Sequence, residues 1–166
     1  QVDIATKTFG EVCNVEEALA PENCIFTTFY GSKDNFYNLI PEFDGLQTTL
    51  VGKLEEYNEN NTIMELVLFK EAIEHVCRIC RVIEYPGGNA MLIGVGGSGK
   101  QSLSRLAGFI MGCTIEQLKV SSKYSEDDLK EDLKRIYMEA GVKGRMTLFI
   151  MTDSQVVRDD FLVYLN

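Results

Sequence analysis

The stretch that decides the fold reads Gly94-Val95-Gly96-Gly97-Ser98-Gly99-Lys100. Its spacing, G-x-x-x-x-G-K, is that of a loop that wraps a phosphate with inward-pointing backbone N–H groups. Such a loop needs positive φ angles and no side chains in the way, and glycine supplies both. Lys100 is placed to neutralise the β and γ oxygens of a nucleotide.

The residues on either side of this loop favour a phosphate site over a chance glycine-rich turn. Ala90–Ile93 is a short apolar run that predicts a buried strand. After the loop, Leu103, Leu106 and Ile110 recur at helical spacing, and Gly112 is expected to end that helix. Strand, loop and helix in this order predict nucleotide binding. The candidate contacts are Gly94, Val95, Gly96, Gly97, Ser98, Gly99, Lys100, Gln101 and Ser102.

Gln101 departs from the usual pattern of this loop. The position after the lysine is normally Ser or Thr, whose hydroxyl binds Mg²⁺. The amide of Gln101 is on a longer arm, and Ser102 is rotated by about 100° around the helix, so neither replaces that hydroxyl. The sequence therefore predicts weakened metal coordination.

A second acidic element is expected after the apolar run Met146–Met151, which predicts a strand buried on both faces. In an ATPase of this type the strand ends in Asp-Glu, which serve metal binding and water activation. Here Thr152 and Asp153 stand instead, as degenerate metal candidates with Asp153 as the candidate catalytic base. A structural alternative is that Asp153 caps the helix carrying Phe161 and Leu165.

Hydrophobic spacing predicts two helices in the first half of the chain. Leu46, Leu50, Leu54 and Tyr57 predict one that starts near Leu46 and ends in residues 58–61. A second stripe consists of Leu66, Phe69, Ile73, Val76, Cys77, Cys80 and Ile83, and Pro86 should stop that helix. Residues 24–30 are expected to form a strand and residues 32–45 a loop.

The second half is expected to contain another strand and another helix. Residues 114–120 form the predicted strand. Ser125 is the expected N-cap of a helix that Gly141 ends. Its apolar face is predicted to be Leu129, Leu133, Ile136, Tyr137 and Ala140. Its charges are expected to form pairs such as Glu126 with Lys130 and Glu131 with Arg135.

Composition bounds the class of protein. The 166 residues are 45% hydrophobic, which suffices for one sizeable core. A net charge of -9 disfavours nucleic acid, and no apolar stretch reaches the roughly 20 residues that cross a bilayer. Five cysteines without repeated spacing indicate reduced thiols in an intracellular protein. Cys77 and Cys80 are expected to be small buried residues, and His75 an ordinary surface or boundary histidine.

Several motifs together resemble the fourth AAA+ module of axonemal dynein heavy chains. They are Leu66-Val67-Leu68-Phe69, GVGGSGKQSL over 94–103, Ser104-Arg105-Leu106, Ala140-Gly141-Val142-Lys143 and residues 149–156. The similarity covers residues 24–166 and is most specific at Gln101 and at Thr152-Asp153. Both departures from the general pattern are therefore expected to be features of this subfamily.

The resemblance implies an α/β P-loop fold, the AAA+ large subdomain, with an incomplete parallel sheet flanked by helices. Residues 62–166 would form this core, truncated before the sensor and lid, and residues 1–61 a less regular connecting segment with a strand and a helix. The strand that pairs between the first and third strands is expected to lie beyond Asn166. Edges left without that strand would be exposed and sticky.

The resemblance also implies a function in a ring in which the first module is the main ATPase. This module would bind ATP or ADP, with Mg²⁺ held poorly, and regulate or brace the ring. Leu66, Val67, Leu68 and Phe69 would lie near the adenine. Implied partners are neighbouring AAA+ modules and, through the full-length protein, intermediate and light chains and microtubules. The implied location is the cytoplasm, cytoskeleton and ciliary axoneme.

Other functions are weighed against this regulatory one. A hydrolytically active ATPase using Asp153 is the main alternative. A GTPase or small-molecule kinase fits less well, because the sequence contains no N-K-x-D motif and no lid arginines. A scaffold that binds nothing would leave the glycine loop without an explanation.

Overall fold

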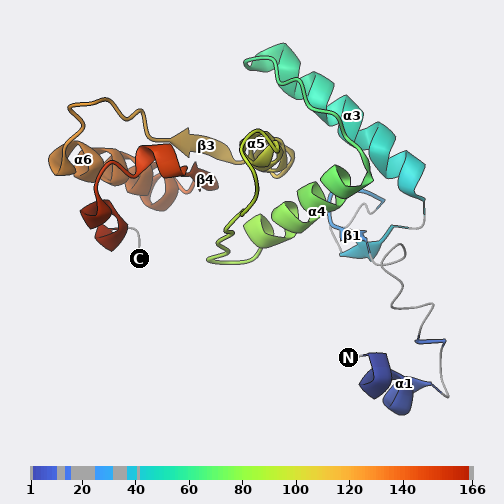
Figure 1. Ribbon diagram of the computed structural model, residues 1–166. Helices are drawn as coiled ribbons and strands as arrows, with labels where there is room; N and C mark the ends of the chain where they lie inside the picture. Colours follow the sequence, from blue (N-terminus) through green and yellow to red (C-terminus); the bar gives the residue numbers. More distant parts are fainter. Residues whose placement is uncertain (1, 11–13, 16–24, 32–36, 41, 165–166) are drawn as a thin grey trace. The chain divides into compact units, whose positions relative to one another are not determined.

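The computed structural model describes residues 2–10, 14–15, 25–31, 37–40 and 42–164. The chain divides into two compact units, Gln1–Ala107 and Gly108–Asn166, which are described in turn (Figure 1). The first unit contains α1 (Val2–Phe9), β1 (Phe26–Thr27), β2 (Asn38–Leu39), α3 (Phe43–Asn60), α4 (Lys70–Glu84) and the start of α5 (Lys100–Ile110). The second contains β3 (Thr114–Gln117), α6 (Glu126–Tyr137), a π-helical turn (Met138–Val142), β4 (Thr147–Ile150) and two 3₁₀ helices (Asp153–Gln155 and Asp159–Tyr164).

Helix α3 confirms the first predicted helix. Leu46, Leu50, Leu54 and Tyr57 are all buried along one face. The expectation of a loop over 32–45 is wrong for residues 38–39 and 43–45. Asn38–Leu39 form β2, which pairs antiparallel with β1, and α3 already begins at Phe43. Stacking of Phe26 on Tyr37, with ring centroids 5.4 Å apart, holds that short strand pair together.

Helix α4 confirms the second stripe only from Ile73 onward. Ala72, Ile73, Val76, Cys77, Ile79 and Cys80 are buried. The prediction that Leu66 and Phe69 belong to the helix is wrong, because α4 begins only at Lys70 and Phe69 is its N-cap with an extended backbone. Gln47 donates a hydrogen bond to the backbone oxygen of Leu68 at 2.9 Å, which uses an acceptor that a helix would need. The helix ends at Glu84, as Pro86 predicts.

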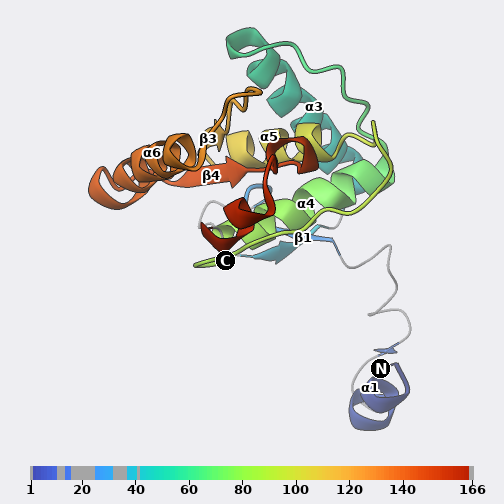
Figure 2. The same cartoon turned by 60° about the vertical axis from the view of Figure 1, so that its left-hand side comes forward.

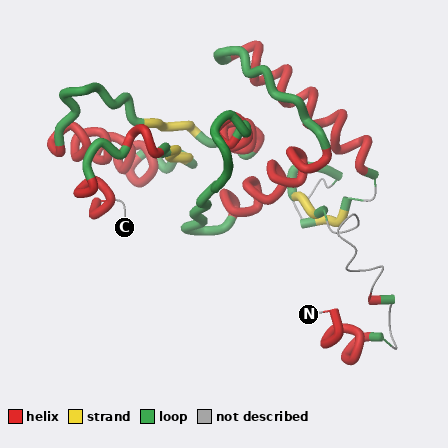
Figure 3. Tube along the Cα trace, in the orientation of Figure 1, coloured by secondary structure: helices red, strands yellow, loops and turns green. Residues whose placement is uncertain are grey.

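Residues 90–93 do not form the predicted buried strand. They are drawn as loop in Figure 3, and Met91 and Ile93 are 89% and 88% exposed. No strand of the described ranges pairs with them. An isolated extended run gains neither ladder hydrogen bonds nor buried apolar area, which is the physical reason for the difference.

The second unit contains the parallel pair that makes the fold α/β. The register of β3 and β4 runs from Thr114 opposite Thr147 to Gln117 opposite Ile150. Helix α6 lies beside this strand pair (Figures 1 and 2). The predicted strand over 114–120 is shorter than expected. The prediction that β4 is buried on both faces is wrong. Only Ile150 of this strand is buried, because β4 has a single neighbouring strand in the described part of the chain.

Helix α6 carries the core of the second unit. Leu129 and Leu133 pack with Leu118 and Phe161, and the ring of Tyr124 meets Phe161 edge-on at 6.0 Å. Ser125 caps the helix as predicted. Its hydroxyl accepts a hydrogen bond from the backbone N–H of Asp128, and the carboxylate of Asp128 accepts one from the backbone N–H of Ser125.

The far end of α6 departs from the prediction. Tyr137 and Ala140 are exposed, because the backbone leaves α-helical geometry at Met138 and forms the π-helical turn. The pair Glu126–Lys130 forms at 2.6 Å. The expected pairing of Arg135 with Glu131 is wrong, since Arg135 binds Glu116 of β3 at 2.8 Å.

The remaining sequence expectations concern cysteines, His75 and membrane spans. Cys77 and Cys80 are buried free thiols, and Cys113 is a half-buried free thiol. His75 is exposed, as predicted. Cys13 and Cys24 lie outside the described residues. No helix in the described ranges has the length and apolar character needed to cross a membrane.

Candidate nucleotide-binding site

The glycine loop has the backbone that its spacing predicts. Gly97 and Gly99 have φ angles of 76° and 75°, which side chains disfavour. A Cβ on Gly94 would lie 3.4 Å from the Ser98 hydroxyl and 3.7 Å from the Lys100 ammonium. By contrast, open space surrounds the Cβ positions of Gly96 and Gly97. The loop is therefore closed around Lys100 and open on the side of these two glycines.

Lys100 lies across the mouth of this loop. Its ammonium donates to the backbone oxygens of Gly94 at 2.8 Å and Val95 at 2.7 Å, and to the Ser98 hydroxyl at 3.2 Å. These three oxygens match the three protons that an ammonium can donate. The loop thus holds the positive charge on its own oxygens, and an incoming anion would have to compete with them for the ammonium.

Helix α5 begins at Lys100, so its N-terminus is part of the loop. The N–H of Leu103 donates to the Gly99 oxygen at 2.8 Å, which makes Gly99 the residue before the first turn. Unpaired N–H groups and the helix dipole favour an anion at this end. Gln101 is exposed and Ser102 half-buried in the same turn. Ser104 donates its hydroxyl proton back to the Lys100 oxygen at 2.9 Å.

Residues 66–69 run extended beside the loop. The Cβ position of Gly99 lies 3.5 Å from a methyl carbon of Leu66, so that side chain contacts the loop. Side chains alternate along the extended run: Leu68 is buried, and Val67 and Phe69 are exposed. Leu66 is therefore the member of this run that the structure brings to the phosphate loop.

Thr152 and Asp153 follow β4 in the second unit. Thr152 is the N-cap of the short helix Asp153–Gln155: its backbone N–H donates to the Gln155 side chain at 2.8 Å, and its hydroxyl lies 3.2 Å from the same oxygen. Asp153 is exposed in the first turn. The alternative that Asp153 is the cap is wrong, because Thr152 occupies that position. Phe161 belongs to the separate helix Asp159–Tyr164, and Leu165 lies outside the described residues.

Gln155 is the residue that sequence reasoning missed at this strand end. It is buried and also donates its amide to the backbone oxygen of Leu118 next to β3. A capping box, with a hydroxyl residue followed three positions later by Glu or Gln, is a signal that could have identified it. Its bonds hold the Thr152 hydroxyl in a structural role.

These residues do not fit a firmly held metal ion. At nucleotide sites Mg²⁺ is usually bound by one or two carboxylates together with water and the substrate phosphates. Asp153 is the one carboxylate of the candidate pair, and the Thr152 hydroxyl is engaged with Gln155 and with Ser154 at 3.0 Å. The described residues include no group of three His, Cys, Asp or Glu side chains that could hold a metal. Among the candidate pair only Asp153 is therefore left as a charged oxygen ligand for Mg²⁺.

The amino-acid sequence is similar to a known family of proteins. The family model described as P-loop containing dynein motor region D4 matches residues 64–166. The chain is 48% identical, over 97% of its length, to the dynein beta chain of the flagellar outer arm of Chlamydomonas reinhardtii. It is 46% identical to the ciliary dynein beta chain of Tripneustes gratilla, and 44% identical to human dynein axonemal heavy chain 9. These matches cover 99% and 100% of the chain, and the chain spans about 4% of each relative.

Proposed function

Because this chain belongs to the family of P-loop dynein motor D4 regions, we propose that it is a regulatory module that binds ATP or ADP. Residues 94–102 bind the phosphates and Leu66, Val67, Leu68 and Phe69 lie near the base. Hydrolysis at this site is slow or absent. The observation that carries the proposal is the loop closed by Lys100, whose ammonium reaches Gly94, Val95 and Ser98.

Phosphate binding requires a small exchange of partners in this loop. An incoming β or γ oxygen replaces one or more of the oxygens that now accept from Lys100. The Lys100 bonds to carbonyls are already charge-assisted, but a phosphate oxygen adds the attraction of its own negative charge, which favours that exchange. The open side at Gly96 and Gly97 leaves room for the phosphates. Leu68 is buried, and Leu66 contacts the loop at Gly99.

Weak hydrolysis is supported by the second unit. An efficient ATPase needs a metal partner and a base that polarises water. Thr152 carries no charge and is bound to Gln155, which leaves Asp153 to serve both purposes. A single short carboxylate that has to bind Mg²⁺ and also orient the attacking water is expected to serve both roles poorly. The alternative function, an active ATPase using Asp153, rests on the exposure of that carboxylate.

The setting of the module is proposed from its relatives, which are named as flagellar, ciliary and axonemal dyneins. The module would work in the cytoskeleton of a cilium or flagellum, beside other AAA+ modules of the same heavy chain. Intermediate chains, light chains and microtubules would be partners of the whole protein. In this setting nucleotide occupancy at Lys100 regulates the ring rather than driving its main step.

Calorimetric titration of the 166-residue chain with ADP and ATP, each with and without Mg²⁺, tests the proposal. Both nucleotides are expected to bind, with little added by Mg²⁺. Lys100→Ala should weaken binding by at least about tenfold, since it removes a charge-assisted bond. Lys119→Ala, at an exposed lysine outside the loop, is the matched control. A folded chain that binds no nucleotide, or binds equally well without Lys100, would refute the nucleotide site.

Phosphate release with Mg²⁺ and ATP separates the two functions. The regulatory proposal expects turnover near the background of the Lys100→Ala variant. Turnover well above that background and lost in Asp153→Asn would replace it with the active ATPase. The substitution keeps the shape of the side chain and removes only its charge, so the fold at Thr152 is preserved.

A further inference from the structure

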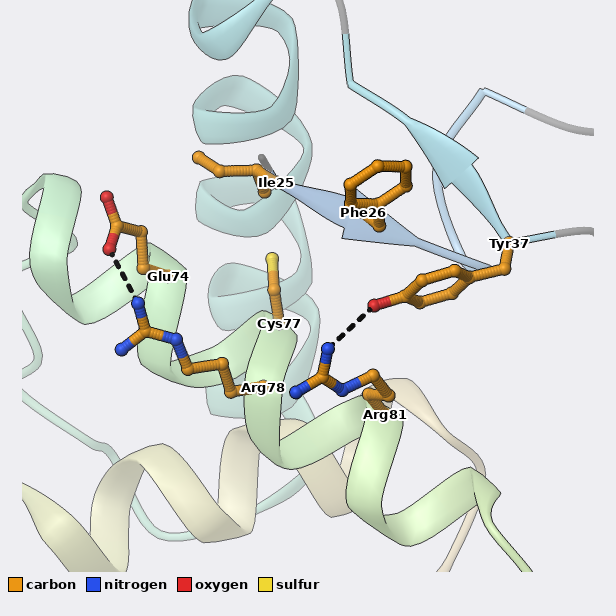
Figure 4. A pocket seen from close by; sticks show the side chains of 7 residues that line it. All are labelled: Ile25, Phe26, Tyr37, Glu74, Cys77, Arg78 and Arg81. Carbon is orange, nitrogen blue, oxygen red and sulfur yellow. Dashed lines mark hydrogen bonds and ion pairs between the residues drawn. The ribbon is translucent and has the colours of Figure 1, made fainter. Parts of the chain in front are cut away.

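A second site lies away from the phosphate loop, between the β1–β2 pair and α4 in the first unit. It is a cleft of about 80 Å³ (Figure 4). Ile25, Phe26 and Tyr37 line it from the strand side. Since a cavity needs roughly 10–15 Å³ by this measure to hold one water molecule, the cleft has room for a small polar head group.

The helix side of the cleft carries two arginines with different partners. Arg78 binds Glu74, one turn away, at 3.2 Å. Arg81 instead donates to the hydroxyl oxygen of Tyr37 at 3.2 Å. Figure 4 shows the Arg78 head turned toward Glu74 and the Arg81 head facing Tyr37. Among the described residues, no carboxylate forms an ion pair with Arg81.

The charge of the lining is therefore one positive unit. Arg78 and Glu74 offset one another, and Arg81 contributes the remaining charge. Cys77 forms the floor between the two arginines, and burial raises the pKa of its thiol to about 12, so it stays neutral at pH 7. A monoanion neutralises this lining, whereas a dianion leaves an excess negative charge in an already acidic chain.

Arg81 and Tyr37 offer donors suited to such an anion. A guanidinium has five N–H groups in a planar fork, and the bond to Tyr37 uses one nitrogen. Tyr37 accepts that bond, so its own hydroxyl proton is left to donate to a ligand. The stacked rings of Phe26 and Tyr37 add an apolar wall for the methylenes of a side chain.

We propose that this cleft binds the carboxylate of an Asp or Glu side chain from an acidic protein segment, with Arg81 and Tyr37 as its direct contacts. Arg78 and Glu74 border the site without holding the ligand. The site is independent of nucleotide binding at Lys100.

The proposal is tested on the ¹⁵N-labelled 166-residue chain by following the side-chain Nε–H signals of its arginines. The probe is the blocked peptide acetyl-Gly-Glu-Gly-amide, with its Gln twin and inorganic phosphate as comparisons at constant ionic strength. The Glu peptide should shift the Arg81 signal saturably, with a dissociation constant of about 1 mM. The Arg158 signal, from an exposed arginine paired with Asp160, should not move.

Two variants assign the contacts. Arg81→Gln should abolish the response of the Phe26 amide signal to the Glu peptide, and Tyr37→Phe should weaken binding by about 2- to 10-fold. Arg158→Gln is the matched control and should bind normally. Unchanged circular dichroism shows that each variant is folded; a variant that unfolds is replaced by Arg81→Lys, which keeps the charge without the fork and should also bind more weakly.

Three outcomes overturn the proposal. The first is an equal response to the Glu and Gln peptides, and the second is a shift at Arg158 as large as that at Arg81. The third is tighter binding of phosphate than of the Glu peptide, which would assign the cleft to a dianion. Because Lys100→Ala does not touch this cleft, a normal peptide response in that variant separates failure of the nucleotide site from failure of this one.

Discussion

At the scale of the residue, Cys77 makes stability depend on alkaline pH. Burial raises the pKa of its thiol from 9.0 to about 12. Below pH 9 the thiol is protonated in the folded and the unfolded chain, so its contribution to the free energy of unfolding is fully present. Between pH 9 and about pH 12 the thiol ionises in the unfolded chain but stays protonated in the folded one. The free energy of unfolding should then fall by up to about 1.4 kcal/mol per pH unit, less whatever solvent screening removes.

Urea denaturation at about pH 8 and about pH 10 measures this loss. Cys77→Ala lowers stability at both pH values because it leaves a cavity, but its loss between them should be smaller than that of the wild type. The pKa of Tyr124 is raised as well, first by burial, and that group is present in both proteins. Equal losses in the two proteins would show that Cys77 does not titrate as described.

At the scale of the element, the Ser125 cap should stabilise α6. The Ser125 hydroxyl accepts from the Asp128 N–H at 3.3 Å, and the Asp128 carboxylate accepts the Ser125 N–H at 2.8 Å. Ser125→Ala should lower the free energy of unfolding by about 1 kcal/mol. Thermal or urea unfolding followed by circular dichroism measures it, with Ser122→Ala, in the exposed turn before the cap, as control. A change no larger than that of the control would mean that the cap contributes nothing.

Elements were predictable where local pattern and tertiary packing agree. The buried stripe from Leu46 to Tyr57 lies within α3, and the cap at Ser125 lies at the start of α6. Each depends on residues close together in the sequence, so both could be predicted from the sequence. Leu66 and Phe69 fit the same helical spacing as Ile73, but an extended run also fits them. The bond from Gln47 to the Leu68 oxygen, across 21 residues, decides between the two. Such long-range bonds leave no local trace in the sequence.

The candidate site divides in the same way. The positive φ angles of Gly97 and Gly99 and the reach of Lys100 follow from local spacing, and the structure contains them. The cleft at Arg81 was not predictable, because it joins a strand segment at Tyr37 to a helix 44 residues later. Two arginines three positions apart on a helix are common on surfaces. Only the fold shows that an aromatic pair faces one of them.

At the scale of the whole molecule, the 166-residue chain should associate with itself through residues 90–95. Met91, Ile93 and Val95 are exposed without a paired strand among the described residues, and exposed apolar edges favour association. The double variant Met91→Lys with Ile93→Lys should remain monomeric at higher concentration, as measured by analytical ultracentrifugation. Its melting temperature should stay within about 2 °C of the wild type, because surface substitutions change stability little.

The double variant Leu162→Lys with Val163→Lys is the matched control, since both are exposed apolar residues of the other unit and the pair adds the same charge. It should leave association unchanged. If it disperses the chain as well as the variant at Met91 and Ile93 does, added charge rather than the unpaired run is responsible. If neither variant changes association, residues 90–95 are not adhesive. If only the variant at Met91 and Ile93 reduces self-association, residues 90–95 are the adhesive surface. Their apolar sequence then needs a neighbouring strand to bury it, as the sequence predicts.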